Sequence, residues 1–201
     1  SFAGAPDASA GLFLVEHTHP ETGTLLVSRG YKILERYDSF TLTEMNENQL
    51  SDAERSGLRA SDMSPLSRIV IGDYDFDSDA EPSLPDRLRV TEYGSGQEGL
   101  FVVQLVGPVK DSWLDRIEEL GAHIVHFVPL NSVLVSMTED VRPDVEFLYF
   151  VGRVLVYQPA YKFSSGLIST TVMVTLPDFA DIPDATAGLS ALGRIKDIQR
   201  S

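Results

Sequence analysis

The chain has 201 residues, 43% of them apolar and 23% charged, which is enough for one or two soluble domains with a buried core. A net charge of −14 disfavours nucleic acid and anionic membranes as partners, because both would repel the chain. The absence of cysteine excludes disulfides, thiol catalysis and cysteine-ligated zinc, and no apolar run is long enough for a membrane span.

The first ten residues, SFAGAPDASA, are small and polar, so we expect a flexible N-terminal arm over 1–10. Such an opening is typical of a secreted or periplasmic protein after removal of its signal peptide. It is equally typical of an arbitrary boundary within a longer sequence. The expected location is extracellular or periplasmic.

Residues 11–72 are predicted to form a first, degenerate α+β unit. Its expected strands are 12–15, 32–37, 40–45 and 68–71, of which the middle two alternate apolar and polar residues like a hairpin. A short helix over 46–56 is expected to stop at Gly57. The turn-rich stretch 17–23 predicts that no proper first helix fits in this unit.

Residues 73–98 are rich in Asp, Ser, Pro and Gly and predict an acidic surface linker. Four carboxylates alternate from Asp73 to Asp79, a spacing that could hold Ca²⁺. The EF-hand pattern fails, since no glycine occupies its sixth position and Leu84 stands where the closing glutamate belongs. A solvated linker is therefore favoured, and calcium binding stays open.

Residues 99–164 predict one complete unit. The expected strands are 100–106, 124–128, 133–137 and 151–157, and the expected helices begin near Asp111 and at Glu139. Ser112 and Asp115 resemble a capping box, and Trp113 is expected in the core. The order βαββαβ predicts a ferredoxin-like fold, an antiparallel sheet with two helices on one face. The fold class is therefore α+β, with tandem units of this kind.

A faint internal repeat supports the tandem arrangement. The stretch from Gly30 to Met45 matches the stretch from Gly121 to Met137, with the same offset at the glycine and at the following isoleucine. A partial third unit is expected over 165–201, with a strand near 172–176 and a helix near 183–192. Half a unit cannot bury its sheet, so we expect either that another domain or chain completes it or that this tail is only marginally ordered.

No pattern for catalysis or for a cofactor is found. The sequence has no Gly-x-Ser-x-Gly elbow, no Gly-rich phosphate loop and no His-Glu-x-x-His helix. His17 and His19 are spaced to share a strand face, whereas His123 and His126 are expected on opposite faces. Polar surface histidines are favoured over a metal site because no third ligand is evident. We expect no catalytic residue, no metal and no cofactor.

The end of the last strand in the complete unit is the candidate partner-binding site. Aromatic residues and a cation gather there, and the candidate residues are Tyr157, Pro159, Tyr161 and Lys162. An alternative of equal weight is that Tyr157 and Tyr161 pack against the preceding unit.

The stretches GLFVVQLVGPVKDSWLDRIEELGAHIVHFVPLNSVLVSM and FVGRVLVYQPAYKFS resemble the N-terminal pro-regions of bacterial subtilisin-like serine proteases. The features that carry the resemblance are Gly107-Pro108, Trp113, Leu120-Gly121, Pro129-Leu130-Asn131 and the run Gln158 to Lys162. The resemblance runs through residues 10–200, although only 99–164 is specific.

The resemblance implies ferredoxin-like units that dock their sheet on the protease domain, assist its folding and block its active site. The catalytic motifs of that family do not occur in this sequence, so no catalytic residue carries over. The expected function is a non-catalytic, protein-binding pro-region module. The alternative is a structural or accessory subunit of an extracellular assembly, joined to neighbouring copies or subunits through strand edges.

Overall fold

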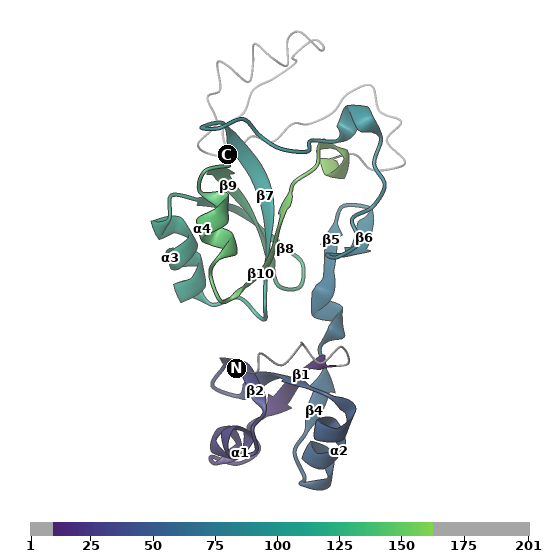
Figure 1. Cartoon of the computed structure of the whole chain (residues 1–201), viewed down its shortest axis with the longest axis vertical. Helices are drawn as coiled ribbons and strands as arrows, with labels where there is room; N and C mark the ends of the chain where they lie inside the picture. Colours follow the sequence, from purple (N-terminus) through teal and green to yellow (C-terminus); the bar gives the residue numbers. More distant parts are fainter. Residues whose placement is uncertain (1–9, 163–201) are drawn as a thin grey trace, which may run out of the picture. The chain divides into compact units, whose positions relative to one another are not determined.

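The computed structural model describes residues 10–162, which all belong to one compact region of the chain (Figure 1). The fold is a mixed α+β arrangement with antiparallel sheets, as the sequence predicts. The predicted partial unit over 165–201 and all but Ala10 of the predicted arm lie outside the described residues.

The N-terminal unit, residues 11–62, forms a four-stranded sheet. Its elements are β1 (Gly11–Glu16), α1 (Thr22–Ser28), β2 (Lys32–Arg36), β3 (Phe40–Met45), α2 (Glu47–Arg55) and β4 (Ala60–Asp62). The strand order is β2-β3-β1-β4, and every neighbouring pair is antiparallel. The helices and one sheet face enclose a core that includes Val15, Leu26 and Met45.

Local signals explain most of this unit. The predicted hairpin is confirmed as β2–β3, and α2 begins with a capping box between Asn46 and Gln49. The prediction that no first helix fits was wrong. The seven-residue α1 buries Thr22 and Leu26 and ends before Gly30, whose φ of +73° suits a helix terminus. Burial of one leucine stabilises a helix whose Thr- and Gly-rich sequence has weak intrinsic propensity.

The C-terminal unit, residues 98–162, forms the second four-stranded sheet. Its elements are β7 (Glu98–Leu105), α3 (Asp111–Glu119), β8 (His123–Val128), β9 (Ser132–Thr138), α4 (Arg142–Glu146), β10 (Val151–Val156) and the 3₁₀ turn η3 (Pro159–Lys162). The strand order β10-β7-β9-β8 again places the first strand between the third and the fourth. Both units therefore share one connectivity.

The core of the C-terminal unit lies between its sheet and its helices. Trp113 is buried there, as predicted, and its ring stacks on Phe150 at a centroid distance of 5.0 Å. The predicted capping box at Ser112 is not formed, since α3 begins after Lys110 with no side-chain cap. The second helix is shorter than predicted, because turns around Val141 and Leu148 take up both ends of the stretch 139–150.

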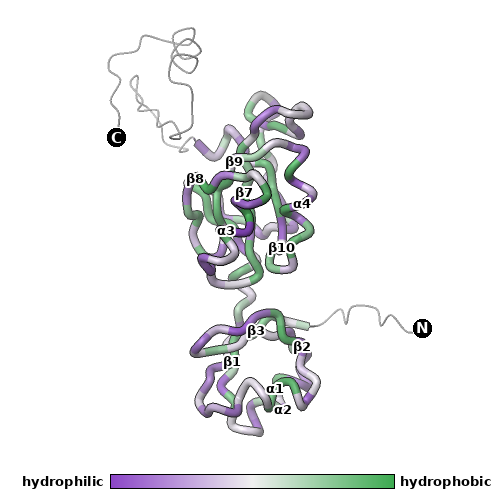
Figure 2. Tube along the Cα trace, turned by 90° about the vertical axis from the view of Figure 1, so that its left-hand side faces the viewer, coloured by the Kyte–Doolittle hydropathy of each residue, from purple (hydrophilic) through white to green (hydrophobic). Residues whose placement is uncertain are grey.

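The segment between the two units differs from the predicted linker. It contains the 3₁₀ turn η1 (Ser64–Ser67), the strands β5 (Arg68–Ile71) and β6 (Tyr74–Asp77), and the 3₁₀ turn η2 (Asp86–Leu88). Strands β5 and β6 form a separate two-stranded sheet that crosses the predicted boundary at 72/73. Gly72 makes the turn with φ of +56°, a backbone conformation that favours glycine. Figure 2 shows that apolar residues are concentrated in the strands of the C-terminal unit.

Candidate protein-binding site

The two faces of the second sheet differ in composition. The face toward the helices is apolar throughout, with Phe101, Val103, Leu105, Val133, Val135, Met137, Val154 and Val156. The opposite face mixes aliphatic side chains with buried polar ones, namely Val102, Gln104, Ser132, Ser136 and Leu155. A mixed composition of this kind is typical of protein–protein interfaces.

The β5–β6 hairpin covers this mixed face, and we refer to residues 66–79 as the cover hairpin. Its inward side chains Ile69, Ile71 and Phe76 form one buried cluster with Val102, Val128 and Leu155 of the sheet. The cross-strand register places Ile69 opposite Phe76, so both point to the same side of the hairpin. The mixed face is therefore occupied by a segment of the same chain.

Two side chains of the sheet, Gln104 and Arg153, make polar contacts with the cover hairpin. Gln104 is only 5% exposed, and its amide Nε2 donates a hydrogen bond to the Leu66 carbonyl at 3.0 Å. Arg153 of β10 forms an exposed ion pair with Asp79. No backbone ladder joins the two-stranded sheet to either four-stranded sheet within residues 10–162.

The four predicted partner-binding residues differ in how far they are exposed to solvent. Tyr161 is 5% exposed, and its ring packs against Tyr74 and Phe76 at centroid distances of 5.0 and 5.9 Å. Burial raises the pKa values of Tyr157 and Tyr161, so both phenols stay neutral at physiological pH.

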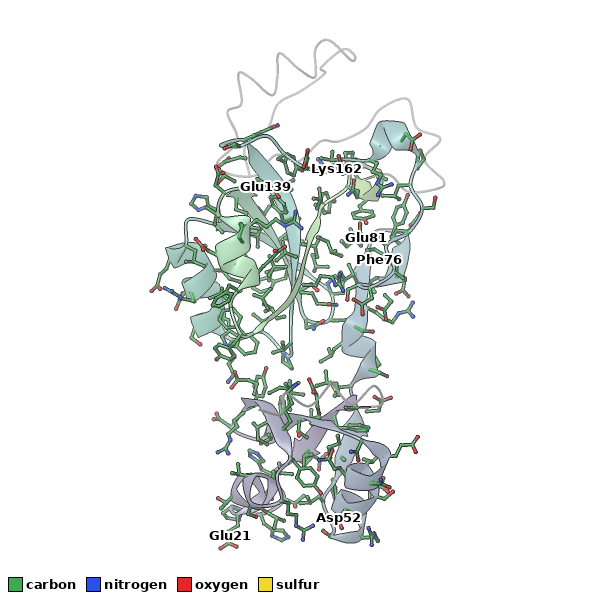
Figure 3. The ribbon with its side chains drawn as sticks, in the orientation of Figure 1. Glu21, Asp52, Phe76, Glu81, Glu139 and Lys162 are labelled. Atoms are coloured by element: carbon green, nitrogen blue, oxygen red, sulfur yellow. The ribbon has the colours of Figure 1, made fainter. Side chains whose placement is uncertain are left out.

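Tyr157 and Pro159 are half-buried, whereas Lys162 is exposed, with its Nζ 5.9 Å from the centre of the Tyr157 ring. Phe76 and Lys162 can be followed in Figure 3. The two tyrosines thus pack within the chain, and Lys162 is the predicted residue most available to a partner.

Gln158, within the same run, holds the segment before β7. Its Oε1 accepts a hydrogen bond from the Val90 amide at 2.7 Å, and its Nε2 donates to the Val90 carbonyl at 3.0 Å. The side-chain amide therefore satisfies both backbone groups of one residue, as a paired strand would. The sequence resemblance had included this glutamine without a structural role.

The alternating aspartates occupy the outer side and the end of the cover hairpin. Asp75 forms an ion pair with Arg68 at 2.7 Å, and Asp77 accepts a hydrogen bond from the Ser67 hydroxyl. Within residues 10–162 there is no group of three or more side chains placed to hold a metal ion. Asp75, Asp77 and Asp79 thus have contacts that account for them in the fold.

The histidines lie in two different settings. His17 contacts the Asp38 carbonyl through Nδ1 at 3.1 Å and the Thr41 hydroxyl through Nε2 at 2.8 Å, so both ring nitrogens have protein partners. His123 and His126 are registered with Ser136 and Leu134, which share a face. The expectation of opposite faces was wrong, because a bulge between Ile124 and His126 adds one residue.

A second feature, which sequence patterns missed, is an exposed aromatic pair after α4. Phe147 is 92% exposed and Tyr149 is 72% exposed. The Tyr149 hydroxyl donates to Glu35 at 3.2 Å, and Glu35 also accepts from Lys110 Nζ at 2.8 Å. Burial raises the pKa of Glu35, but the hydrogen bonds from Lys110, Tyr149 and the Arg36 amide outweigh it, so the pKa is lowered overall.

The face of the first sheet that points away from its helices carries a shallow hollow. Its volume is about 510 Å³, and it is lined by Leu14, Glu16, His17, Thr18, Ser39 and Phe40. Leu14 and Phe40 are half-buried and provide its apolar floor. The hairpin thus covers the mixed face of the second sheet, whereas the corresponding face of the first sheet keeps this hollow beside the fully buried Leu42.

Among the described helices, none is both long enough and apolar enough to cross a membrane. Neither a curated protein nor a solved structure matches the chain. A family model matches residues 46–157, from the N-cap of α2 to the residue after β10, which is more than half of the chain. The chain therefore belongs to the family described as a domain of unknown function, DUF8729.

Proposed function

We propose that the chain is a non-catalytic module, similar to the pro-region of a subtilisin-like protease, that binds a protease domain as a folding chaperone and inhibitor. The observation that carries this proposal is the shared connectivity of the two units, each βαββαβ with its first strand between the third and the fourth. We interpret both as ferredoxin-like units, as the sequence resemblance implies. Function on such a fold depends on its surfaces, since the fold alone hosts many activities.

The accessible surfaces limit which parts of the chain can contact a protease domain. The mixed face of the second sheet is covered by Ile69, Ile71 and Phe76. The first sheet offers the hollow above Leu14 and Phe40, and Lys162 is exposed where the chain leaves η3. While the hairpin stays in place, the proposed contact therefore uses the hollow of the first sheet together with Lys162.

Inhibition of a protease tests this proposal. The purified chain is titrated into a subtilisin-like protease, ideally one encoded beside or beyond it, and hydrolysis of a small peptide substrate is followed. We expect a concentration-dependent loss of rate that is weakened by Leu14→Asp in the hollow. Glu54→Asp, on the exposed side of α2, is the matched control and leaves inhibition unchanged. No inhibition at any concentration of the chain would rule the proposal out.

Refolding gives an independent readout of the chaperone role. The denatured protease domain is diluted into buffer with and without an excess of the chain, and the recovered activity is measured after the chain is removed. Higher recovery in its presence supports the proposal. Equal recovery with the chain and with an unrelated acidic protein contradicts it.

A second candidate function is that of a structural or accessory subunit in an extracellular assembly. It is favoured by the exposed aromatic pair Phe147 and Tyr149 and by the edge strand β8, where Phe127 is also exposed. Light scattering over a concentration series distinguishes the two. Self-association abolished by Phe147→Ser supports the assembly, whereas a monomer at all concentrations favours the protease partner.

A further inference from the structure

We infer that the cover hairpin is a gate on the second unit: it occupies in cis the sheet face that binds a protein partner, and binding there requires its displacement. This inference rests on the proposed protein-binding function and adds a mechanism of regulation. The occupant of the face is residues 66–79 of the same chain, already seated on it.

The composition of the covered face is the first argument. On the strands of the second sheet, buried polar side chains are confined to this face, at Gln104, Ser132 and Ser136. The helix face of the same strands has only apolar side chains among its buried residues. A permanent core layer gains nothing from such polar positions, while a face that meets water when uncovered tolerates them.

The way the hairpin is attached is the second argument. It shares no backbone ladder with the four-stranded sheets, and a two-stranded hairpin is marginally stable by itself. Its own polar contacts, Arg68 with Asp75 and Ser67 with Asp77, stay within the hairpin. Leaving the face therefore breaks side-chain packing, the Gln104 hydrogen bonds and the Arg153–Asp79 pair, but none of the hydrogen bonds of the β5–β6 ladder.

The turn of the hairpin makes a further close contact, with η3. A Cβ on Gly72 would lie 3.1 Å from the Tyr161 carbonyl oxygen, so the turn approaches η3 closely. The Tyr161 ring at the same place packs on Tyr74 and Phe76 of β6. Displacing the hairpin thus also removes Tyr74 and Phe76 from the ring of Tyr161, which keeps its edge-on contact with Tyr157.

Gly72→Ala is the variant that weakens the contact between the hairpin turn and η3. Alanine disfavours a φ of +56°, and its Cβ crowds the Tyr161 carbonyl. Gly96→Ala is the matched control, because Gly96 has a similar φ of +72° with nothing within 4 Å of the added Cβ. Asp79→Ala is a milder second variant, which removes only the exposed pair with Arg153.

Native-state hydrogen exchange with peptide-level mass spectrometry tests the gate on the full chain. A gate opens as its own cooperative unit, so residues 68–77 exchange faster than β7 in the unmodified chain. Gly72→Ala raises hairpin exchange about tenfold over Gly96→Ala, with β7 unchanged. Equal exchange free energies for the hairpin and β7 in every variant show a permanent layer and overturn the gate.

Protease inhibition by the same variants tests the gate separately from the proposed protease-binding function on which it rests. If only the open form binds through this face, apparent affinity rises in proportion to the open fraction, so Gly72→Ala inhibits up to about tenfold more tightly than Gly96→Ala. Equal inhibition by both variants overturns the gate while leaving the protease-binding function standing. No inhibition by any variant overturns the proposed function, and the exchange result then stands as the test of the gate alone.

Discussion

Gln158 and Val90 are joined by two hydrogen bonds, with the glutamine amide accepting from the Val90 N–H at 2.7 Å and donating to its carbonyl at 3.0 Å. Gln158 is 3% exposed and lies two residues after the end of β10, while Val90 belongs to the irregular segment before β7. One side chain thus fixes the path of a segment that has no regular structure there.

Replacing Gln158 tests that role. Gln158→Ala leaves both Val90 backbone groups without these partners, so we expect a loss of about 1 to 3 kcal/mol in unfolding free energy. Chemical denaturation followed by circular dichroism measures it. Gln97→Ala, an exposed glutamine in the same segment, is the control, with an expected loss below about 0.5 kcal/mol. A smaller effect at Gln158 than at Gln97 would contradict the assignment.

Gly99 and Tyr93 form a second testable pair. The Tyr93 ring lies over Gly99 of β7, where a Cβ would overlap it, and the ring meets Phe101 edge-on at 5.4 Å. Gly99→Ala should therefore displace the ring and cost about 1 to 3 kcal/mol. Adding Tyr93→Ser should recover part of that loss, because the clash is gone. A double-mutant cycle with no coupling between the two positions would show that the ring is not held there.

The lowered pKa of Glu35 predicts a pH dependence of stability. A carboxyl whose pKa is lower in the folded state than its ordinary value of 4.5 stabilises the fold above that value. This contribution disappears as the pH falls through the folded pKa. Glu35→Gln should cost about 1 to 2 kcal/mol at pH 7 and little at pH 3.

Denaturant midpoints at the two pH values check this prediction. Glu44→Gln is the matched control, because its pair with Lys32 is exposed and should be worth less than about 0.5 kcal/mol. A cost for Glu35→Gln that is as large at pH 3 as at pH 7 would show that packing, and not charge, is responsible.

Trp113 is the single tryptophan of the chain, so its fluorescence reports on the C-terminal unit. It stacks on Phe150 with an interplanar angle of 2°, within the main core of that unit. Phe150→Ala should cost about 3 to 5 kcal/mol and shift the emission of Trp113 to the red in the folded state. An unchanged emission maximum would mean that Trp113 does not pack on this ring.

Much of the fold could be predicted because local patterns agree with it. The alternation in 32–45 predicted the β2–β3 hairpin, and the apolar periodicity from Trp113 to Leu120 predicted α3. The first helix was missed because its stability comes from burying Leu26, which a window of weak helix formers does not reveal. The strand 74–77 was missed because its aspartates suggested a solvated linker, although they occupy only its outer side.

The candidate site, like the fold, could be predicted from the sequence only in part. The sequence by itself determined an acidic chain of apolar strands and helices in the order βαββαβ, and it singled out the run from Tyr157 to Lys162. Only the tertiary structure decided that Tyr161 is buried beneath Tyr74 and Phe76, and that residues 66–79 cover the mixed face of the second sheet. Alternation specifies which residues share a strand face, but which segment covers that face depends on contacts between residues distant in sequence.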